Sequence, residues 1–225
     1  MKKWITSHGI EVVRLNGFRC NCFLIITADE TWMIDTGALC DKQKIQKQID
    51  LCGVKKLSGI ILTHAHINHV ESTEWFSTKY RCPVYIHDSE LHFIQTGDCL
   101  IPKAAKKSVA WIEGIVRFIP FLNKYPACRE ATALTFEEPV IWNPYVKLME
   151  TPGHSEGGVS ILVDDEIAIV ADLMRGTSIS LFWANQPGLV EVSWKKLLQE
   201  PCSLFLPSHG REISRKRIER ALAKK

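Results

Sequence analysis

Three histidines stand close together in the segment Thr63-His64-Ala65-His66-Ile67-Asn68-His69. The spacing His-x-His places the imidazoles of His64 and His66 on the same side of an extended turn. His69 begins a predicted helix, so its ring is held by a rigid element. Neutral imidazole is the commonest side-chain ligand of transition metals, and this spacing favours a metal site over a group of solvent-exposed loop histidines.

Three further residues of metal-ligand type each follow a predicted strand. They are His154, Asp172 and His209, which come after the strand Val146–Glu150, the apolar run Ile167–Ala171 and the strand Ser203–Leu206. A sheet projects functional groups just past the C-terminal ends of its strands, and His64 also follows a predicted buried strand. The shared placement of these residues strengthens the prediction of a metal centre.

The elements that must position these residues alternate along the chain. Strands are predicted at Glu11–Leu15, Cys22–Thr27, Thr31–Ile34, Leu57–Leu62, Val84–Ile86, Val146–Glu150, Ser160–Val163, Ile167–Val170 and Ser203–Leu206. Helices are predicted at Asp41–Leu51, Val70–Tyr80 and Val192–Gln199, and from Ser214 onward. Such alternation of strand and helix patterns indicates α/β layering.

Length and composition are those of an ordinary globular protein. The 225 residues, 46% of them apolar, suffice for one domain with a substantial core or for two small ones. No internal repeat or Pro/Gly/Ser-rich linker divides the sequence, so we predict a single domain over residues 1–225. The formal net charge of +3 is too small to favour nucleic acid or an anionic membrane as the main partner. The basic residues between Arg211 and Lys225 are interpreted as a solvated helix end.

Targeting patterns and cysteine usage point to a reducing compartment. The segment after Lys2 and Lys3 holds no apolar run long enough for a signal peptide, and no stretch approaches the ~20 apolar residues of a membrane helix. A cytoplasmic location is therefore expected, with all eight cysteines as free thiols. Cys20 and Cys22 are interpreted as small core residues on one face of a strand, with a weak metal or redox pair as the alternative.

The order and spacing of these motifs resemble the metallo-β-lactamase superfamily. The resemblance runs from Ile34-Asp35-Thr36-Gly37 through the histidine motif, Thr151-Pro152-Gly153-His154 and Asp172 to Ser208-His209-Gly210. It implies an α/β fold, a four-layer αββα sandwich of two mixed sheets with outer helices. It also implies a metal site at one sheet edge.

The resemblance also implies a ligand for each metal position. His64, His66 and His154 would bind a first metal, His69 and His209 a second, and Asp172 would bridge the two. The implied cofactor is one or two zinc ions, with manganese or iron as alternatives. Asp35 would lie beside the metals, or it would be a turn carboxylate that caps backbone N–H groups.

Asn68 departs from the family pattern. The family motif is His-x-His-x-Asp-His, and Asn68 takes the place of the aspartate. An amide leaves the site one positive charge richer and is a poorer zinc ligand than a carboxylate, so a second metal should bind more weakly. Three interpretations follow: a natural variant with one metal or another metal, a binding homologue without activity, or an engineered Asp-to-Asn change.

The function implied is metal-dependent hydrolysis. A zinc-bound hydroxide would cleave an ester, lactone, thioester or related bond of a small-molecule substrate, with Asn68, Asp172 and His209 in the catalytic positions. The alternatives are a catalytically impaired metal-binding or ligand-sensing homologue and a phosphodiesterase. No membrane partner is expected, nucleic acid is disfavoured, and the oligomeric state is left open, a homodimer included.

The segment from Asp88 to Asn143 carries a weaker pattern than its flanks. X-Pro pairs such as Ile119-Pro120 interrupt it, and it is rich in large aromatic residues such as Trp111. We interpret residues 88–143 as an insert that covers the active site and shapes the pocket.

Overall fold

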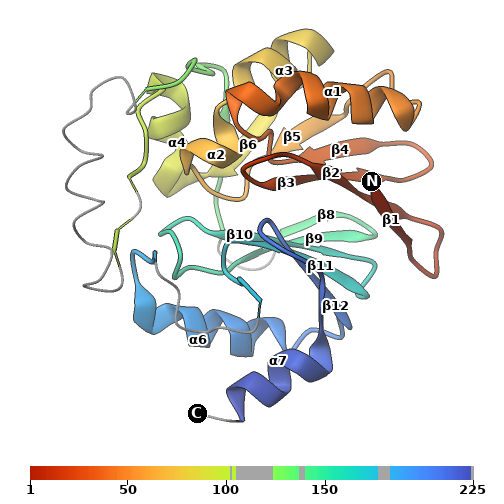
Figure 1. Ribbon diagram of the computed structural model, residues 1–225, viewed down its shortest axis with the longest axis vertical. Helices are drawn as coiled ribbons and strands as arrows, with labels where there is room; N and C mark the ends of the chain where they lie inside the picture. Colours follow the sequence, from red (N-terminus) through yellow and green to blue (C-terminus); the bar gives the residue numbers. More distant parts are fainter. Residues whose placement is uncertain (102, 105–123, 137–139, 177–182, 224–225) are drawn as a thin grey trace. The chain divides into compact units, whose positions relative to one another are not determined.

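The chain contains two compact units, each built around one mixed β-sheet (Figure 1). The computed structural model describes the chain except for residues 102, 105–123, 137–139, 177–182 and 224–225. The first unit comprises Met1–Leu100 and Pro120–Thr135, and the second comprises Ile101–Ile119 and Phe136–Lys225.

The described part of the first unit holds a seven-stranded sheet with its strands in chain order. The strands are β1 (Lys2–Ile5), β2 (Glu11–Asn16), β3 (Asn21–Ile26), β4 (Thr31–Ile34), β5 (Gly59–Ile61), β6 (Val84–His87) and β7 (Thr132–Leu134). Strands β1 to β4 pair antiparallel and β4 to β7 pair parallel. Because parallel strands end at the same edge, the residues that follow β4 and β5 lie side by side.

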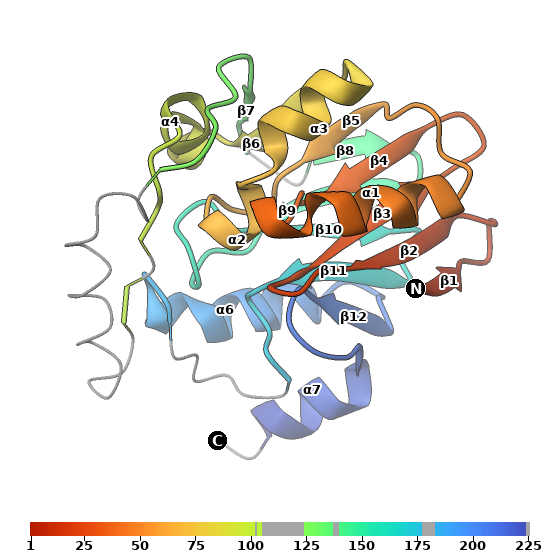
Figure 2. The same ribbon diagram turned by 45° about the horizontal axis from the view of Figure 1, so that its top comes forward.

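Helices of the first unit pack on this sheet. They are η1 (Leu39–Asp41), α1 (Lys42–Leu51), α2 (Ile67–Val70), α3 (Thr73–Tyr80) and α4 (Asp88–Thr96). Helices α1 and α3 lie on one face of the sheet, and α4 packs against β6 and β7 (Figure 2). The core there joins alternate strand residues, such as Leu24 and Met33, to Ile45 of α1 and Phe76 of α3. The alternation follows from the period of two in a strand.

The described part of the second unit holds a six-stranded sheet in the order β13-β12-β11-β10-β9-β8. Its strands are β8 (Val140–Asn143), β9 (Val146–Glu150), β10 (Val159–Val163), β11 (Ile167–Ala171), β12 (Leu204–Pro207) and β13 (Ile213–Ser214), and its helices are α6 (Pro187–Leu197) and α7 (Arg215–Leu222). Only β11 and β12 pair parallel among these strands. Trp194 of α6 is fully buried, and its Nε1 donates to the carbonyl of Leu173 at 3.0 Å.

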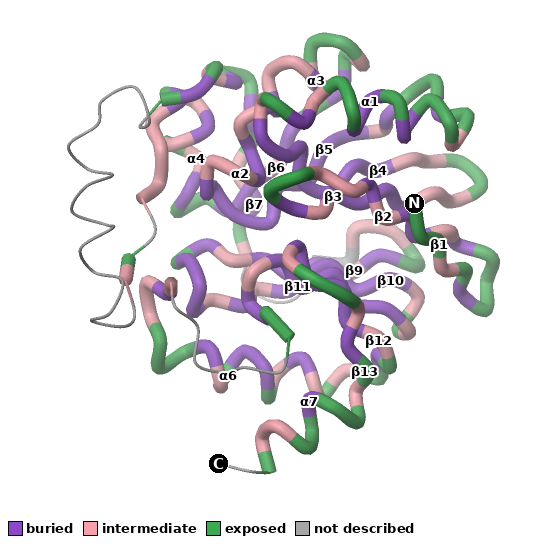
Figure 3. The backbone as a smooth tube through the Cα atoms, in the orientation of Figure 1, coloured by how far each residue is buried: buried purple, intermediate pink, exposed green. Residues whose placement is uncertain are grey.

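Burial follows the sheets closely. Strands β10 and β11 are buried along their whole length, whereas the outward sides of α1 and α7 are exposed (Figure 3). A strand buried at every position has a continuous apolar pattern, as Ile167–Ala171 does in the sequence.

The predicted elements correspond to observed ones, with corrections. The helix predicted over Val70–Tyr80 begins only at Thr73, as α3, because Val70 ends α2 and the chain bends at Ser72, where the N–H donates to the carbonyl of Gly37. The helix predicted over Val192–Gln199 is α6, which begins earlier, at Pro187. Helix α4 lies where a weak pattern was expected. Its buried positions include the polar Glu90 beside Ile94, and a carboxylate on the buried face hides the helical period of apolar residues. The short strands β1, β7, β8 and β13 were not predicted.

The segment 88–143 is described except for residues 102, 105–123 and 137–139. Tyr125 donates its hydroxyl to the carbonyl of Phe93 at 3.0 Å, and Lys124 pairs with Asp98 at 3.2 Å, so both contacts lie within the first unit. Much of the predicted insert lies outside the described residues, and its role as a cover over the site stays a prediction.

Two further sequence expectations concern membranes and thiols. Among the residues that the structure describes, no helix is both long and apolar enough to cross a membrane. All eight cysteines lie in the described ranges, and all are free thiols. Cys20 and Cys22 are buried in the core of the first unit, as expected for small core residues.

Candidate metal centre

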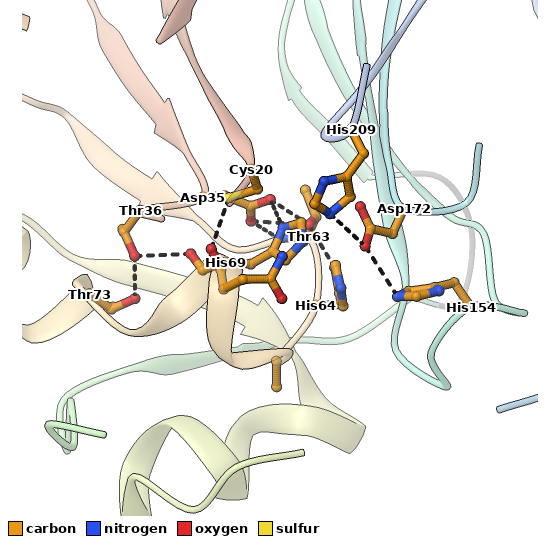
Figure 4. A network of polar contacts seen from close by, with 12 residues as sticks. Cys20, Asp35, Thr36, Thr63, His64, His69, Thr73, His154, Asp172 and His209 are labelled. Carbon is orange, nitrogen blue, oxygen red and sulfur yellow. Dashed lines mark hydrogen bonds and ion pairs between the residues drawn. The ribbon is translucent and has the colours of Figure 1, made fainter. Parts of the chain in front are cut away.

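Asp35 joins the ends of two neighbouring strands in the first unit. It follows β4 and adopts a φ of 58°, a left-handed conformation that aspartate tolerates better than most residues. Its buried carboxylate accepts hydrogen bonds from the backbone N–H and the hydroxyl of Thr63, both at 2.8 Å at their shortest (Figure 4). It also contacts Nδ1 of His69 at 2.7 Å. Asp35 therefore caps a backbone N–H group, as one of the two interpretations expected, and it also contacts a motif histidine.

The hydroxyl of Thr63 connects the Asp35 carboxylate to the ring of His64. Its oxygen lies 3.0 Å from Nδ1 of His64. A hydroxyl has one proton, which the Asp35 carboxylate accepts, so the oxygen accepts the Nδ1–H of His64. Both His64 and His69 thus carry their proton on Nδ1, and Nε2 is the nitrogen of each ring with a lone pair for a metal.

The three motif histidines pack together in the first unit. All three are buried, and the ring centroid of His64 lies 4.6 Å from that of His66 and 4.1 Å from that of His69. His66 stands at the N-cap of α2, and His69 lies within this helix. This agrees with the expectation that the rings of His64 and His66 share one side of the turn.

The backbone of α2 is fastened to the loop after β4. The carbonyl of His69 accepts hydrogen bonds from the N–H groups of Thr36 and Gly37 at 2.8 and 3.0 Å. Gly37 has a φ of 78°, and a Cβ there would lie 2.6 Å from the side chain of Ile45. The glycine of the Asp-Thr-Gly motif is therefore required both by its backbone conformation and by the close packing of α1.

Two contacts to the histidine motif were not foreseen. The carboxylate of Glu90 in α4 accepts a hydrogen bond from the N–H of Ala65 at 2.5 Å. The thiol of Cys20 donates to the carbonyl of Asn68 at 2.8 Å. Neither partner has a sequence pattern that indicates such a role, because each lies far from the motif along the chain.

The second unit brings its own three predicted residues together. His154, Asp172 and His209 follow β9, β11 and β12, and the Asp172 carboxylate lies 3.5 Å from Nε2 of His154 and 3.3 Å from Nε2 of His209 (Figure 4). The N–H of Ser208 donates to the carbonyl of Ala171 at 3.0 Å and so fastens the ends of β11 and β12. A carboxylate oxygen between two imidazole nitrogens is an arrangement that suits a shared metal ligand.

His154 is oriented by a backbone carbonyl. Its Nδ1 lies 3.0 Å from the carbonyl oxygen of Trp183, which accepts the Nδ1–H and leaves Nε2 as the nitrogen with a lone pair. The preceding Gly153 has a φ of 139°, and a Cβ there would lie 2.8 Å from the backbone nitrogen of Val190. Glycine at this position lets the loop pass close to the start of α6. The sequence indicated the histidine but not its carbonyl partner.

These donors fit a divalent metal. In His64, His69 and His154 the Nδ1 atom binds an oxygen acceptor, which is the usual arrangement of histidines that coordinate through Nε2. Imidazole nitrogen and carboxylate oxygen suit zinc, manganese and iron.

Burial raises the pKa of the Cys99 thiol to about 11 and that of Cys202 to about 12, so these thiols stay protonated at neutral pH.

Several curated relatives are named as probable metallo-hydrolases. "Probable metallo-hydrolase YqgX" of Bacillus subtilis (strain 168) is 28% identical over 200 residues, which is 86% of this chain and 86% of that protein. "Probable metallo-hydrolase MJ0888" of Methanocaldococcus jannaschii is 24% identical over 158 residues, 69% of each chain.

Solved structures share the fold at low sequence identity. The B3 metallo-β-lactamase BLEG-1 matches with a TM-score of 0.71 and 20% identity, over 92% of this chain and 95% of that one. TTHA1623, whose structure is described as a di-iron-bound form, matches with a TM-score of 0.67 and 22% identity, over 93% and 97%. These matches confirm the predicted fold class. The family model of the metallo-β-lactamase superfamily matches residues 15–209, which is most of the chain, and the protein is therefore a member of that superfamily.

Proposed function

We propose that this protein is a metal-dependent hydrolase that cleaves an ester, lactone, thioester or related bond of a small molecule. The observation that carries the proposal is the orientation of His64, His69 and His154, each with Nδ1 hydrogen-bonded to an oxygen acceptor. Membership of the superfamily supports it, as do the metallo-hydrolase names of the relatives.

The proposed ligand set draws on both units. His64, His66 and His154 would hold a first metal, His69 and His209 would hold a second, and Asp172 would serve both. All six residues lie within or at the end of the range that the family model matches. We propose zinc, with manganese or iron as alternatives, and these donor types are compatible with each of the three. A bound divalent ion supplies Lewis acidity and activates a water molecule for attack.

Side chains of the protein have further roles in the proposed reaction. Asp35 and Thr63 keep His69 and His64 in the coordinating tautomer. Asp172 would be the carboxylate among the proposed ligands and would offset part of the positive charge there. Asn68 could orient the attacking water by a hydrogen bond but could not take its proton, so proton transfer would be less assisted than in a chain with the usual aspartate. We place His209 beside Asp172 as the third catalytic residue, and the 3.3 Å contact between the two supports this placement.

Asn68 also supports a second candidate, a homologue that binds a metal or ligand without turnover. The same fold and donors would then serve recognition, and hydrolysis would stay at background. A phosphodiesterase is a third possibility within the same chemistry.

A substrate screen on metal-analysed protein tests the proposal. The purified protein is assayed on p-nitrophenyl esters, lactones, thioesters and phosphodiesters, with added Zn²⁺, Mn²⁺ or Fe²⁺ and with a chelator. Hydrolysis of a carbon ester or thioester that the chelator abolishes supports the proposal. Background rates on every class with metal bound favour the binding homologue, and activity confined to phosphodiesters favours the third candidate.

Metal content in variants of both units tests the ligand set. His66→Ala in the first unit and His154→Ala in the second should both lose the metal, because removal of one of three histidine ligands severely weakens such a site. His92→Ala is the matched control, since His92 is exposed and outside the motifs. A His154→Ala protein with unchanged metal content would refute the shared site.

A further inference from the structure

Glu90 is a buried carboxylate in a place that the proposed function does not explain. It lies on α4 and is 1% exposed, and one of its oxygens accepts the N–H of Ala65 at 2.5 Å. Glutamate is almost never fully buried unless it is paired, because removal of a carboxylate from water is costly. One partner of Glu90 is a backbone amide of the histidine motif, 25 residues away along the chain.

Ala65 is the residue between His64 and His66. The turn that carries these three residues follows β5 and precedes α2, so it lies outside any helix or strand ladder. Two carboxylates hold its alternate amides: Asp35 accepts the N–H of Thr63, and Glu90 accepts that of Ala65. A rotation of the peptide at Ala65 would move both flanking imidazoles, because they share its backbone.

We propose that Glu90 is a positioning residue that holds the His64-Ala65-His66 turn in the conformation needed to bind the metal. The inference rests on the proposed function, since it assumes that His64 and His66 are ligands. The Glu90 side chain is long enough to accept the N–H of Ala65, and α4 is the helix that places it there. Groups that orient metal ligands typically affect metal affinity by about 10- to 100-fold.

Two conservative variants separate the effect of side-chain length from the effect of charge. Glu90→Gln keeps the length and an acceptor oxygen but removes the charge, whereas Glu90→Asp keeps the charge but is one methylene too short. Gln95→Ala is the matched control. Gln95 lies on the same helix, and its side chain donates to the carbonyl of Ala131 at 3.1 Å. This hydrogen bond does not involve the histidine motif.

Four measurements are made on the full-length protein. Zinc affinity is determined by competition with a chromogenic chelator, and Co²⁺-loaded protein gives a visible spectrum that reports ligand geometry. Hydrogen exchange of the Ala65 amide is followed in the metal-free protein, where it reports the hydrogen bond directly. Circular dichroism of the metal-free variants verifies that they are folded.

Glu90→Asp should bind zinc about 10- to 100-fold more weakly, with an altered Co²⁺ spectrum and faster exchange at Ala65. Glu90→Gln should stay within about threefold of wild type, since a neutral acceptor replaces a charged one. Gln95→Ala should match wild type. The inference is overturned if Glu90→Asp binds zinc as wild type does, or if Glu90→Gln is as weak as Glu90→Asp.

The two proposals fail in different ways. A wild-type protein that binds zinc but hydrolyses nothing would refute the proposed function, and the Glu90 variants would still be decided by affinity and exchange. A wild-type protein that binds no metal would overturn both.

Discussion

At the scale of single residues, oxygen acceptors decide which nitrogen of each histidine is able to bind a metal. The Asp35 carboxylate, the Thr63 hydroxyl and the Trp183 carbonyl accept or relay the Nδ1 protons of His69, His64 and His154. The Asp35 carboxylate is held by the backbone N–H of Thr63, and the Thr63 hydroxyl is held by Asp35, so these contacts fix the orientation of the two rings.

Asp35→Asn is expected to weaken metal binding by about 10- to 100-fold and to destabilise the fold by roughly 1–3 kcal/mol. The amide cannot accept from Thr63 and His69 as the carboxylate does. Metal titration and urea denaturation of the metal-free protein measure the two effects.

Asp41→Asn is the matched control for this variant. Asp41 is also a buried carboxylate, and it accepts the N–H groups of Phe18 and Arg19 at 2.8 and 3.2 Å. It should lose stability but keep its metal. Equal metal affinity in Asp35→Asn and wild type would contradict the role of Asp35.

Asn68→Asp is the second prediction at this scale. The added carboxylate offsets part of the positive charge of two metals and is able to ligate and orient the attacking water. Metal content should approach two per chain, and hydrolysis should rise by about 10²–10⁴-fold, as for general acid–base assistance. Metal analysis and the rate on the best substrate of the screen measure both.

The outcomes distinguish the three interpretations of Asn68. A rise in metal and rate supports a weakened or engineered second site. More metal at background rate supports a binding homologue, and a flat or lower rate in an active enzyme supports an enzyme adapted to one metal.

At the scale of elements, the polar contacts that position α2, α4 and α6 are long-range. Helix α4 is recognised poorly from the sequence because its buried face carries Glu90, and α2 is a single short helix fastened by the loop at Thr36. The basic C-terminal segment, interpreted as a solvated helix end, includes one exception. The guanidinium of Arg215 donates to the carbonyls of Leu198, Glu200 and Cys202 after the end of α6.

Arg215→Ala should therefore destabilise the second unit by roughly 1–3 kcal/mol, since several carbonyls lose a charged donor. Arg215→Lys should recover little of this loss, because an ammonium cannot match the planar fork of guanidinium donors. Urea denaturation measures both, with Lys216→Ala as control because Lys216 is exposed on the same helix. An Arg215→Ala protein as stable as the Lys216→Ala protein would refute the capping role.

At the scale of the whole molecule, buried thiols link stability to alkaline pH. Burial raises the pKa of Cys82 and Cys99 to about 11 and that of Cys202 to about 12, from an ordinary value of 9.0. A raised pKa in the folded state means that the protonated thiol favours folding. This contribution is complete below pH 9 and is lost as pH rises toward the folded pKa, because the unfolded chain ionises first.

We expect the free energy of unfolding to fall above pH 9, with each such thiol contributing at most about 1.4 kcal/mol per pH unit. Cys202→Ala should lose stability at pH 7 through its cavity, yet show a shallower decline between pH 9 and 11 than wild type. Urea denaturation at several pH values measures the slopes. Identical slopes in the two proteins would contradict a buried thiol at Cys202.

The sequence by itself determined the kind of residues at the site, their order and the strands that they follow. His64, His154, Asp172 and His209 were predicted because a strand followed by a ligand-type residue is a local pattern. The α/β class followed from periodicity, which is a property of neighbouring residues, and the superfamily was indicated by the resemblance of the motifs to the family's.

Only the tertiary structure decided which groups hold those residues in place. The contacts of His69 with Asp35, of His154 with Trp183 and of Ala65 with Glu90 span 34, 29 and 25 residues. A single hydrogen bond between distant residues leaves no period or spacing in the chain. The contact of His69 with Asp35 forms because β4 and β5 end at one edge, and that of Ala65 with Glu90 forms because α4 packs on β6 and β7. Both are consequences of the complete sheet rather than of any one segment.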